Sequence, residues 1–93
     1  MIRLSVMYPR SDGTTFDMDY YKSKHTEIVL RTLRPLKWEI DNGIDGPYVA
    51  IGHLYFESMD TMGTAMSNGA EATGDVTNFT DVEPAFQISE VVT

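Results

Sequence analysis

The sequence contains no cysteine, and its second half contains no Lys or Arg. Without cysteine the chain cannot form disulfides, cysteine-ligated zinc sites, iron–sulfur clusters or a thiol nucleophile. All seven Lys and Arg residues lie in positions 1–37, where four acidic residues leave a net charge of +3. Residues 38–93 carry ten acidic residues and a net charge of −10. The total of −7 opposes binding to nucleic acid and to anionic lipid.

Long apolar segments are also missing from the chain. No run approaches the ~20 apolar residues that span a bilayer. The start, Met1-Ile2-Arg3-Leu4, lacks the apolar region of a secretory signal, so we expect a cytoplasmic protein with no membrane partner. The length of 93 residues predicts a single domain, residues 1–93, and a hydrophobic content of 42% predicts that it is folded. So short a chain has a modest core, which a partner subunit would enlarge.

Local patterns predict the element order β-α-β-β-α-β. Alternation over residues 2–8 predicts a strand, and a stretch without Gly or Pro over residues 18–33, preceded by a potential N-cap at Asp17, predicts a helix. Two further strands are predicted over residues 36–40 and 48–56, with a turn-rich segment between them.

The remaining third of the chain completes this order. Ser58 is a candidate cap for a helical region that Asn68-Gly69 interrupts and that runs to about residue 76, and a last strand is predicted over residues 85–92. This is the order of an α+β, ferredoxin-like fold, with a four-stranded antiparallel sheet and two helices on one face.

The third predicted strand is apolar on both of its faces. Val49 and Ile51 lie on one face, and Leu54 and Phe56 lie on the other. A sheet face in contact with water should instead carry regularly alternating polar residues. We therefore expect the face without helices to pack against a second copy of the chain, which makes a homodimer.

The two histidines are the side chains that titrate near neutral pH without a large shift. His25 shares a predicted helix face with Tyr21 and Ile28, where it could act as general acid or base toward a phenol or enol oxygen. A buried histidine bonded to a carbonyl or a tyrosine hydroxyl would show the same pattern. His53 shares a strand face with Ile51 and could line a pocket or a subunit interface.

No metal or cofactor site is predicted. The histidines are 28 residues apart, and no carboxylate has a ligand spacing to either of them. The common nucleotide, zinc-protease and serine-hydrolase motifs are absent. Aromatic residues are spread over every predicted element, and they either converge on a slot for a ring-shaped ligand or fill a small core. They are Tyr8, Tyr20, Tyr21, Trp38, Tyr48, Phe79 and Phe86.

The segment FDMDYYKSKH at residues 16–25 resembles the signature of EthD-like proteins, in which a tyrosine pair precedes a helix histidine. The first strand with Tyr8-Pro9 at its end and the tail over residues 78–91 also fit, so the resemblance covers essentially the whole chain. One departure is that Thr26 and Glu27 follow the histidine, where family members often carry an apolar residue and then Pro-Leu.

The resemblance implies a dimeric α+β barrel, in which two ferredoxin-like subunits pack sheet against sheet. It also implies that His25 lines a pocket, with Tyr20 and Tyr21 as supports. Relatives of this fold include cofactor-free monooxygenases and muconolactone isomerases, and the family is named for a component of bacterial ether degradation.

We therefore expect a small metabolite-processing protein that binds an aromatic or lactone-like compound between helices and sheet, without a cofactor. As an enzyme it would be a cofactor-independent oxidoreductase, isomerase or decarboxylase with His25 as general acid or base. One alternative is a non-catalytic accessory or ligand-binding dimer of a degradation pathway, and another is a structural dimer without ligand. The expected substrate contacts are Tyr20, Tyr21, Trp38, His53 and Phe79.

Overall fold

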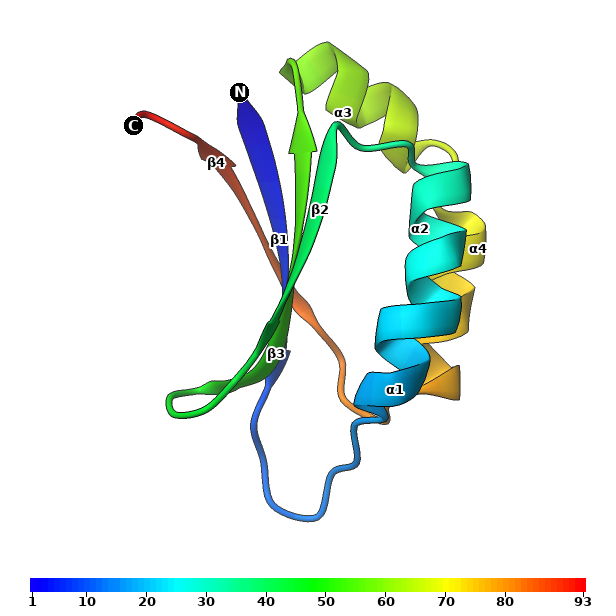
Figure 1. Ribbon diagram of the computed structural model, residues 1–93, viewed down its shortest axis with the longest axis vertical. Helices are drawn as coiled ribbons and strands as arrows, with labels where there is room; N and C mark the ends of the chain where they lie inside the picture. Colours follow the sequence, from blue (N-terminus) through cyan, green and yellow to red (C-terminus); the bar gives the residue numbers. More distant parts are fainter.

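A four-stranded antiparallel sheet and a single layer of helices make up the molecule (Figure 1). The computed structural model describes residues 1–93. The strands are β1 (Ile2–Pro9), β2 (Lys37–Asn42), β3 (Tyr48–Phe56) and β4 (Ala85–Glu90). The helical segments are α1 (Met18–Tyr20), η1 (Tyr21–His25), α2 (Thr26–Thr32), α3 (Met59–Met66), α4 (Ala70–Asp75) and η2 (Val76–Asn78). This order confirms the α+β, ferredoxin-like prediction.

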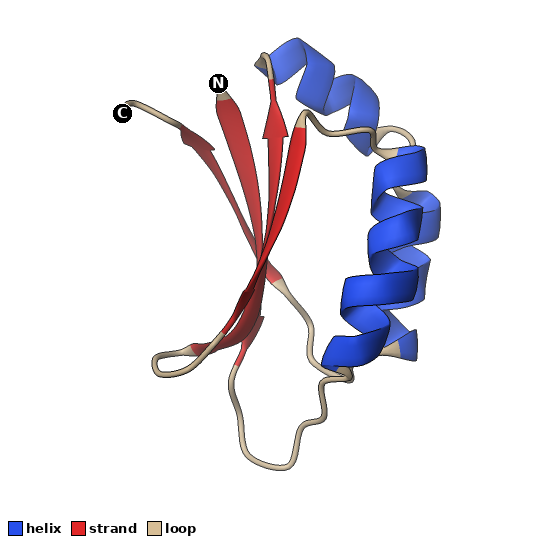
Figure 2. Ribbon diagram, viewed as in Figure 1, coloured by secondary structure: helices blue, strands red, loops and turns tan.

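The strands lie in the order β2-β3-β1-β4, and every neighbouring pair is antiparallel. Leu4 in the central strand β1 is opposite Leu54 in β3 and Ile88 in β4, so these side chains share one face of the sheet. All helices cover that same face, and no element covers the other (Figure 2). The sheet and the helices therefore form two layers, in a molecule that measures 38 × 29 × 18 Å.

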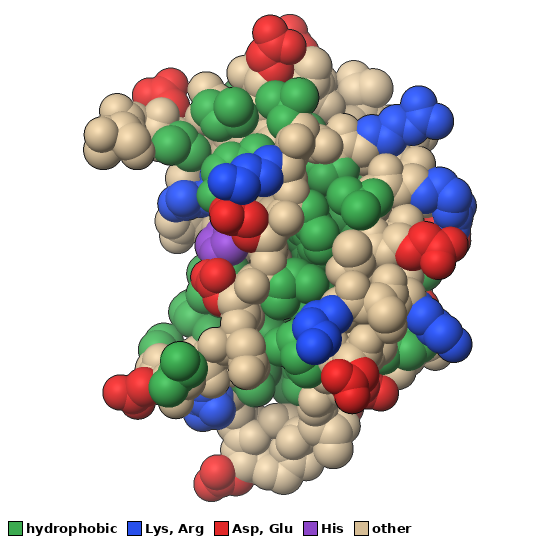
Figure 3. Space-filling view, in the orientation of Figure 1, with side chains coloured by type: hydrophobic (Ala, Val, Ile, Leu, Met, Phe, Trp, Pro, Cys, Tyr) green, Lys and Arg blue, Asp and Glu red, His purple; other side chains and the backbone are tan.

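The core between the layers has an aliphatic and an aromatic part. The aliphatic part joins strands β1 and β3 to α2, α3 and α4, with Leu4, Val29 and Leu54 among its buried residues. The aromatic part contains Tyr8 and Phe79 and lies beneath the start of the first helix. Burying one such large side chain contributes about 1.5–3 kcal/mol to stability. Figure 3 shows hydrophobic side chains along the seam between the layers, with charged groups on the outer surfaces.

The first helix contains a π turn that the sequence did not predict. Asp17 caps its start through a bond from the Tyr20 amide to Oδ1 at 3.1 Å, as the sequence predicted. Residues 21–25 are then wound as a π helix, in which a turn takes more residues than in an α-helix. The buried face therefore continues from His25 to Val29, and the predicted Ile28 is only half-buried.

The second helical region begins with the predicted cap. Ser58 and Thr61 form a capping box, in which each side chain bonds the backbone amide of the other residue. The region is interrupted at Asn68-Gly69 and resumes as α4 and η2, as the sequence predicted. None of the helices combines the length and the apolar composition that a bilayer crossing requires.

Candidate functional site

A cavity of about 390 Å³ lies between the sheet and the helices, where the two parts of the core meet. Leu4, Val6 and Leu54 line it from the sheet, while His25 and Val29 line it from the first helix. The segment over residues 80–84 closes one end, and 13 of the 21 lining residues are hydrophobic. Ligand pockets have volumes of roughly 300–1,000 Å³ and mostly apolar walls with a few polar groups, so this cavity has the size and lining of a binding site.

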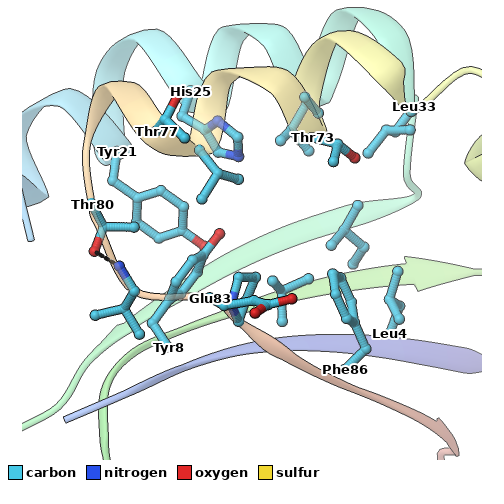
Figure 4. A pocket seen from close by; sticks show the side chains of 18 of the residues that line it. Leu4, Tyr8, Tyr21, His25, Leu33, Thr73, Thr77, Thr80, Glu83 and Phe86 are labelled. Atoms are coloured by element: carbon cyan, nitrogen blue, oxygen red, sulfur yellow. Dashed lines mark hydrogen bonds between the residues drawn. The ribbon is translucent and has the colours of Figure 1, made fainter. Parts of the chain in front are cut away.

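His25 lines the cavity from the helix side (Figure 4). Its Nδ1 lies 3.0 Å from Oδ2 of Asp75, and the two side chains are only 6% and 7% exposed. Because an ionised carboxylate only accepts hydrogen bonds, Nδ1 carries the hydrogen and donates it to Asp75. Nε2 therefore keeps a free lone pair, since the one side-chain hydrogen bond of His25 is made through Nδ1.

Asp75 is stabilised as an anion although it is buried. Burial alone would raise the pKa of its carboxyl group, but bonds from Asn78, Tyr20 and His25 outweigh this effect and lower that pKa. The Tyr20 hydroxyl and the Asn78 amide donate to Oδ1 at 2.7 and 2.9 Å. A buried carboxylate that accepts three hydrogen bonds stays ionised beside the imidazole.

Burial also sets the protonation state of His25. It lowers the pKa of the imidazole below the ordinary value of 6.5, and the bond to Asp75 and its charge only partly oppose this effect. His25 is therefore neutral near pH 7. When the ring does accept a proton at Nε2, the adjacent carboxylate stabilises the imidazolium.

Two buried tyrosine hydroxyls lie close to each other near the sheet, below the histidine (Figure 4). The Tyr21 ring stacks on the His25 ring with a centroid distance of 5.3 Å, and its hydroxyl is buried without a hydrogen bond of good geometry. The neighbouring hydroxyl is that of Tyr8, which rises from β1 (Figure 4). Burial raises the pKa of both phenols, so both remain protonated and can donate a hydrogen bond.

Gly52 makes room for the Tyr21 hydroxyl above the sheet. A Cβ atom at this position would collide with that hydroxyl and would lie 2.7 Å from Cη2 of Trp38. The Trp38 ring lines the cavity, and its Nε1 donates to the Thr26 hydroxyl at 3.0 Å. The Thr26 hydroxyl in turn donates to the Tyr21 carbonyl at 3.0 Å, so it links the backbone of the π turn to the Trp38 side chain.

The structure brings together some of the predicted site residues and separates others. His25, Tyr21 and Trp38 all line the cavity. Phe79 lies behind the wall, with its ring centroid 4.7 Å from that of His25, and Tyr20 contacts Asp75 and not the cavity.

His53 lies on the other face of the sheet and does not line the cavity. It bonds Ser5 in β1 at 3.0 Å through Nδ1 and Asp41 in β2 at 2.8 Å through Nε2. No three His, Asp or Glu side chains converge as metal ligands, in the cavity or elsewhere.

Sequence reasoning missed Asp75 and Gly52. Asp75 is 50 residues from His25 in the chain and is one of ten acidic residues in the second half, so no spacing singles it out. Gly52 interrupts an otherwise apolar strand, and an isolated glycine within a strand often indicates close approach of another group.

Sheet, helices and the histidine-lined cavity define the class: an α+β, ferredoxin-like protein with a ligand-sized apolar cavity between its layers. Neither a family model nor a curated protein matches the sequence. Among solved structures, the chain is similar to the crystal structure of an EthD-like protein from Ralstonia eutropha, with a TM-score of 0.91 and 35% sequence identity. This match covers 99% of this chain and 92% of that chain.

At this identity and coverage the chain belongs to the EthD-like family, which confirms the resemblance. It is also similar to the crystal structure of an ethyl tert-butyl ether D (EthD) family protein from Bacillus halodurans, with a TM-score of 0.78 over 99% of both chains. The sequence identity in that pair is 14%, so the second likeness shows the fold alone.

Replacing Gly52 with alanine should disturb the site and destabilise the protein. The new methyl group would displace the Tyr21 hydroxyl, and overpacking of this kind costs about 1–3 kcal/mol. Gly63→Ala is the matched control, because no atom lies within 4 Å of that position and alanine favours a helix. Thermal unfolding should show a lower Tm for Gly52→Ala only. Equal melting temperatures for the two variants would contradict the close approach.

Acid should destabilise the protein in two stages. The pKa of His25 is lowered from 6.5, so the unfolded chain binds more protons, and the free energy of unfolding should fall as the pH drops below about 6.5. The pKa of Asp75 is lowered from 3.8, which adds a second loss at more acidic pH. Urea unfolding across this range measures both stages. His25→Gln should weaken the first, and a wild-type stability that does not change between about pH 7 and 5 would contradict it.

Proposed function

We propose that the cavity binds a small aromatic or lactone-like compound and that His25 is a general acid or base toward it. The observation that carries the proposal is the state of the imidazole. Its Nδ1 is held by a buried carboxylate, and its Nε2 is an unpaired acceptor on an apolar cavity. An acceptor fixed in one tautomer and facing a mostly apolar cavity is suited to taking a proton from a bound hydroxyl.

The proposed proton transfer needs no group other than those of the chain. A phenol or enol hydroxyl donates a hydrogen bond to Nε2 of His25, the O–H bond breaks, and the electron pair stays on the ligand oxygen. The N–H bond that forms makes an imidazolium ion, which Asp75 stabilises. Such general base catalysis contributes about 10²–10⁴-fold in rate.

An accessory role without chemistry is the second candidate. Phe86 and Met66 line the cavity and are 60% and 39% exposed, so its mouth is apolar. An exposed apolar mouth favours the transfer of an apolar ligand to another protein. A place in ether degradation belongs to this candidate, and it is supported by the family name that the Bacillus halodurans protein carries.

We also propose that two copies pack through the uncovered face of the sheet. Met7 and Ile51 are neighbours at its centre and are only half-buried. The buried Nε of Arg3 has no partner on this face, which also carries Glu39 and Asp41. A two-fold axis would place the same surface of both copies in contact, so residues of both charge signs on one face can pair across it.

Nitrophenol tests the role of His25, because its anion absorbs visible light and its neutral form does not. At about pH 6, below the pKa of free nitrophenol, the wild-type protein should bind it with part of the bound ligand ionised. His25→Gln should abolish this ionisation and weaken binding about tenfold or more, as expected for loss of a hydrogen bond to a charged group. The matched control, His53→Gln, changes the histidine on the other sheet face and should retain both properties.

Two outcomes of that titration would contradict the proposal. Binding without ionisation that His25→Gln leaves unchanged would overturn the acid–base role and support the accessory role. Failure of nitrophenol and other ring compounds to bind at all would overturn both roles.

The dimer is tested by Ile51→Lys, which places a charge at the centre of the proposed interface. Light scattering should give a mass about twice the 10.5 kDa of one chain for the wild type, and a monomer for the variant. Ile44→Lys is the control, because Ile44 is 95% exposed in the β2–β3 loop and should leave the dimer intact. A wild-type protein that is monomeric at micromolar concentration would contradict this arrangement.

A further inference from the structure

The cavity has carboxylate groups at its edge and no Lys or Arg among its lining residues. Among its 21 lining residues none is Lys or Arg, whereas Asp81 and Glu83 are both present. From this lining and its geometry we infer that the cavity selects uncharged ligands that carry a hydroxyl group, and that it discriminates against carboxylates. The inference rests on the proposed ligand-binding function and names its substrate class.

The absence of basic residues from the walls follows from where the sequence places them. Residues 38–93, which supply α4, the closing segment and β4, contain no Lys or Arg. On the first helix, Lys22, Lys24 and Arg31 are exposed, and Arg31 bonds Glu71 of α4 at 3.1 Å. In the first half, Arg10 donates to carbonyl groups of the β2–β3 loop.

The other basic side chains also lie away from the cavity. Arg3 and Lys37 share the sheet face of Tyr55, which is the face without helices. Arg34 is exposed between the first helix and β2. None of these residues is a cavity-lining residue, so no cation is available to an anionic ligand.

The negative groups of the site have different roles. Asp75 is ionised directly behind His25, and Asp81 accepts a bond from the Thr15 amide at 3.1 Å. Glu83 has neither a hydrogen bond nor an ion pair within the chain, and Figure 4 places its carboxylate at the sheet side of the cavity. Glu83 is exposed, so its carboxylate lies at the cavity edge, where solvent and a ligand can both reach it.

A ligand carboxylate would meet unfavourable interactions at each of these positions. It would lose its hydration on entering an apolar cavity, find no Lys or Arg to pair with, and lie close to like charges. His25 could offset these costs only by taking a proton from solvent, which its burial opposes. A hydroxyl group carries no charge to repel, and its smaller loss of hydration is offset because either Nε2 of His25 or the Glu83 carboxylate can accept its hydrogen bond.

The volume of the cavity narrows the class of expected ligands further. An apolar cavity of roughly 150 Å³ is sufficient for benzene, and this cavity has about 390 Å³. A two-ring phenol is therefore an appropriate probe. Of the three reaction types expected from the family resemblance, decarboxylation of a free carboxylate is the one that this selectivity disfavours.

The test compares naphthol, naphthoate and methylnaphthalene, which share one ring system and differ in one substituent. Trp38 is the one tryptophan of the chain and lines the cavity, so its single indole N–H resonance reports where each probe binds as well as its affinity. At about pH 7 the wild type should bind naphthol at least about tenfold more tightly than naphthoate. Methylnaphthalene should bind less tightly than naphthol, because it offers no donor to either acceptor.

Glu83→Gln should improve naphthoate binding several-fold without improving that of naphthol. Glu90→Gln is the matched control, because it removes the same charge from a residue that does not line the cavity. It should leave the ratio of the two affinities unchanged.

The outcomes separate this inference from the proposed function. If naphthoate binds as tightly as naphthol, or if Glu83→Gln leaves their ratio unchanged, the selectivity is overturned while ligand binding stands. If no probe moves the Trp38 resonance, the ligand-binding function fails and the inference falls with it. Preference for naphthol that Glu83→Gln reduces and Glu90→Gln retains supports the inference.

Discussion

The rest of the site depends on the buried carboxylate of Asp75. It accepts hydrogen bonds from Tyr20 and His25 of the first helix and from Asn78 of η2, so it joins two parts of the helical layer that are about 50 residues apart in sequence. A buried charge is tolerated only when its hydrogen bonds are satisfied. If the two segments moved apart, the Asp75 carboxylate would lose its hydrogen bonds or become exposed to water. The contact between the segments therefore holds the His25 imidazole at the cavity wall.

The sequence predicts the features that depend on neighbouring residues, but not the contacts between distant segments such as that of Asp75 with His25. The strands and helices follow from local periodicity, and Asp17 and Ser58 cap their helices because capping depends only on neighbouring residues. The positions of His25 and Tyr21 on one helix face follow from the same local rule. The partner of His25 comes from a distant segment of the chain. Residues 38–93 contain ten acidic residues, and no local pattern indicates which of them contacts His25. Tyr20 illustrates the same limit, because its hydroxyl meets Asp75 and not the cavity.

The charge division of the chain has a counterpart in the structure. Basic groups of the first half lie on the outer side of the first helix, on the uncovered sheet face and at the β2–β3 loop. The acidic second half supplies both the buried anion behind His25 and the free carboxylate of Glu83. The same division thus leaves the outer surface mixed in charge and places two exposed carboxylates, those of Asp81 and Glu83, at the edge of a mostly apolar cavity that no Lys or Arg lines.

The π turn over residues 21–25 gives the site a dependence on chain length as well as on residue type. Each residue of an α-helix advances by about 100° around its axis. A π turn takes one residue more than the α turn it replaces, so the helix faces before and after it keep their directions. Losing one residue between Tyr21 and His25 would restore regular α winding and shorten their spacing from four residues to three, which would change how the two rings stack. Among related chains, a one-residue deletion in the first helix would thus alter the cavity wall while both residue types are retained.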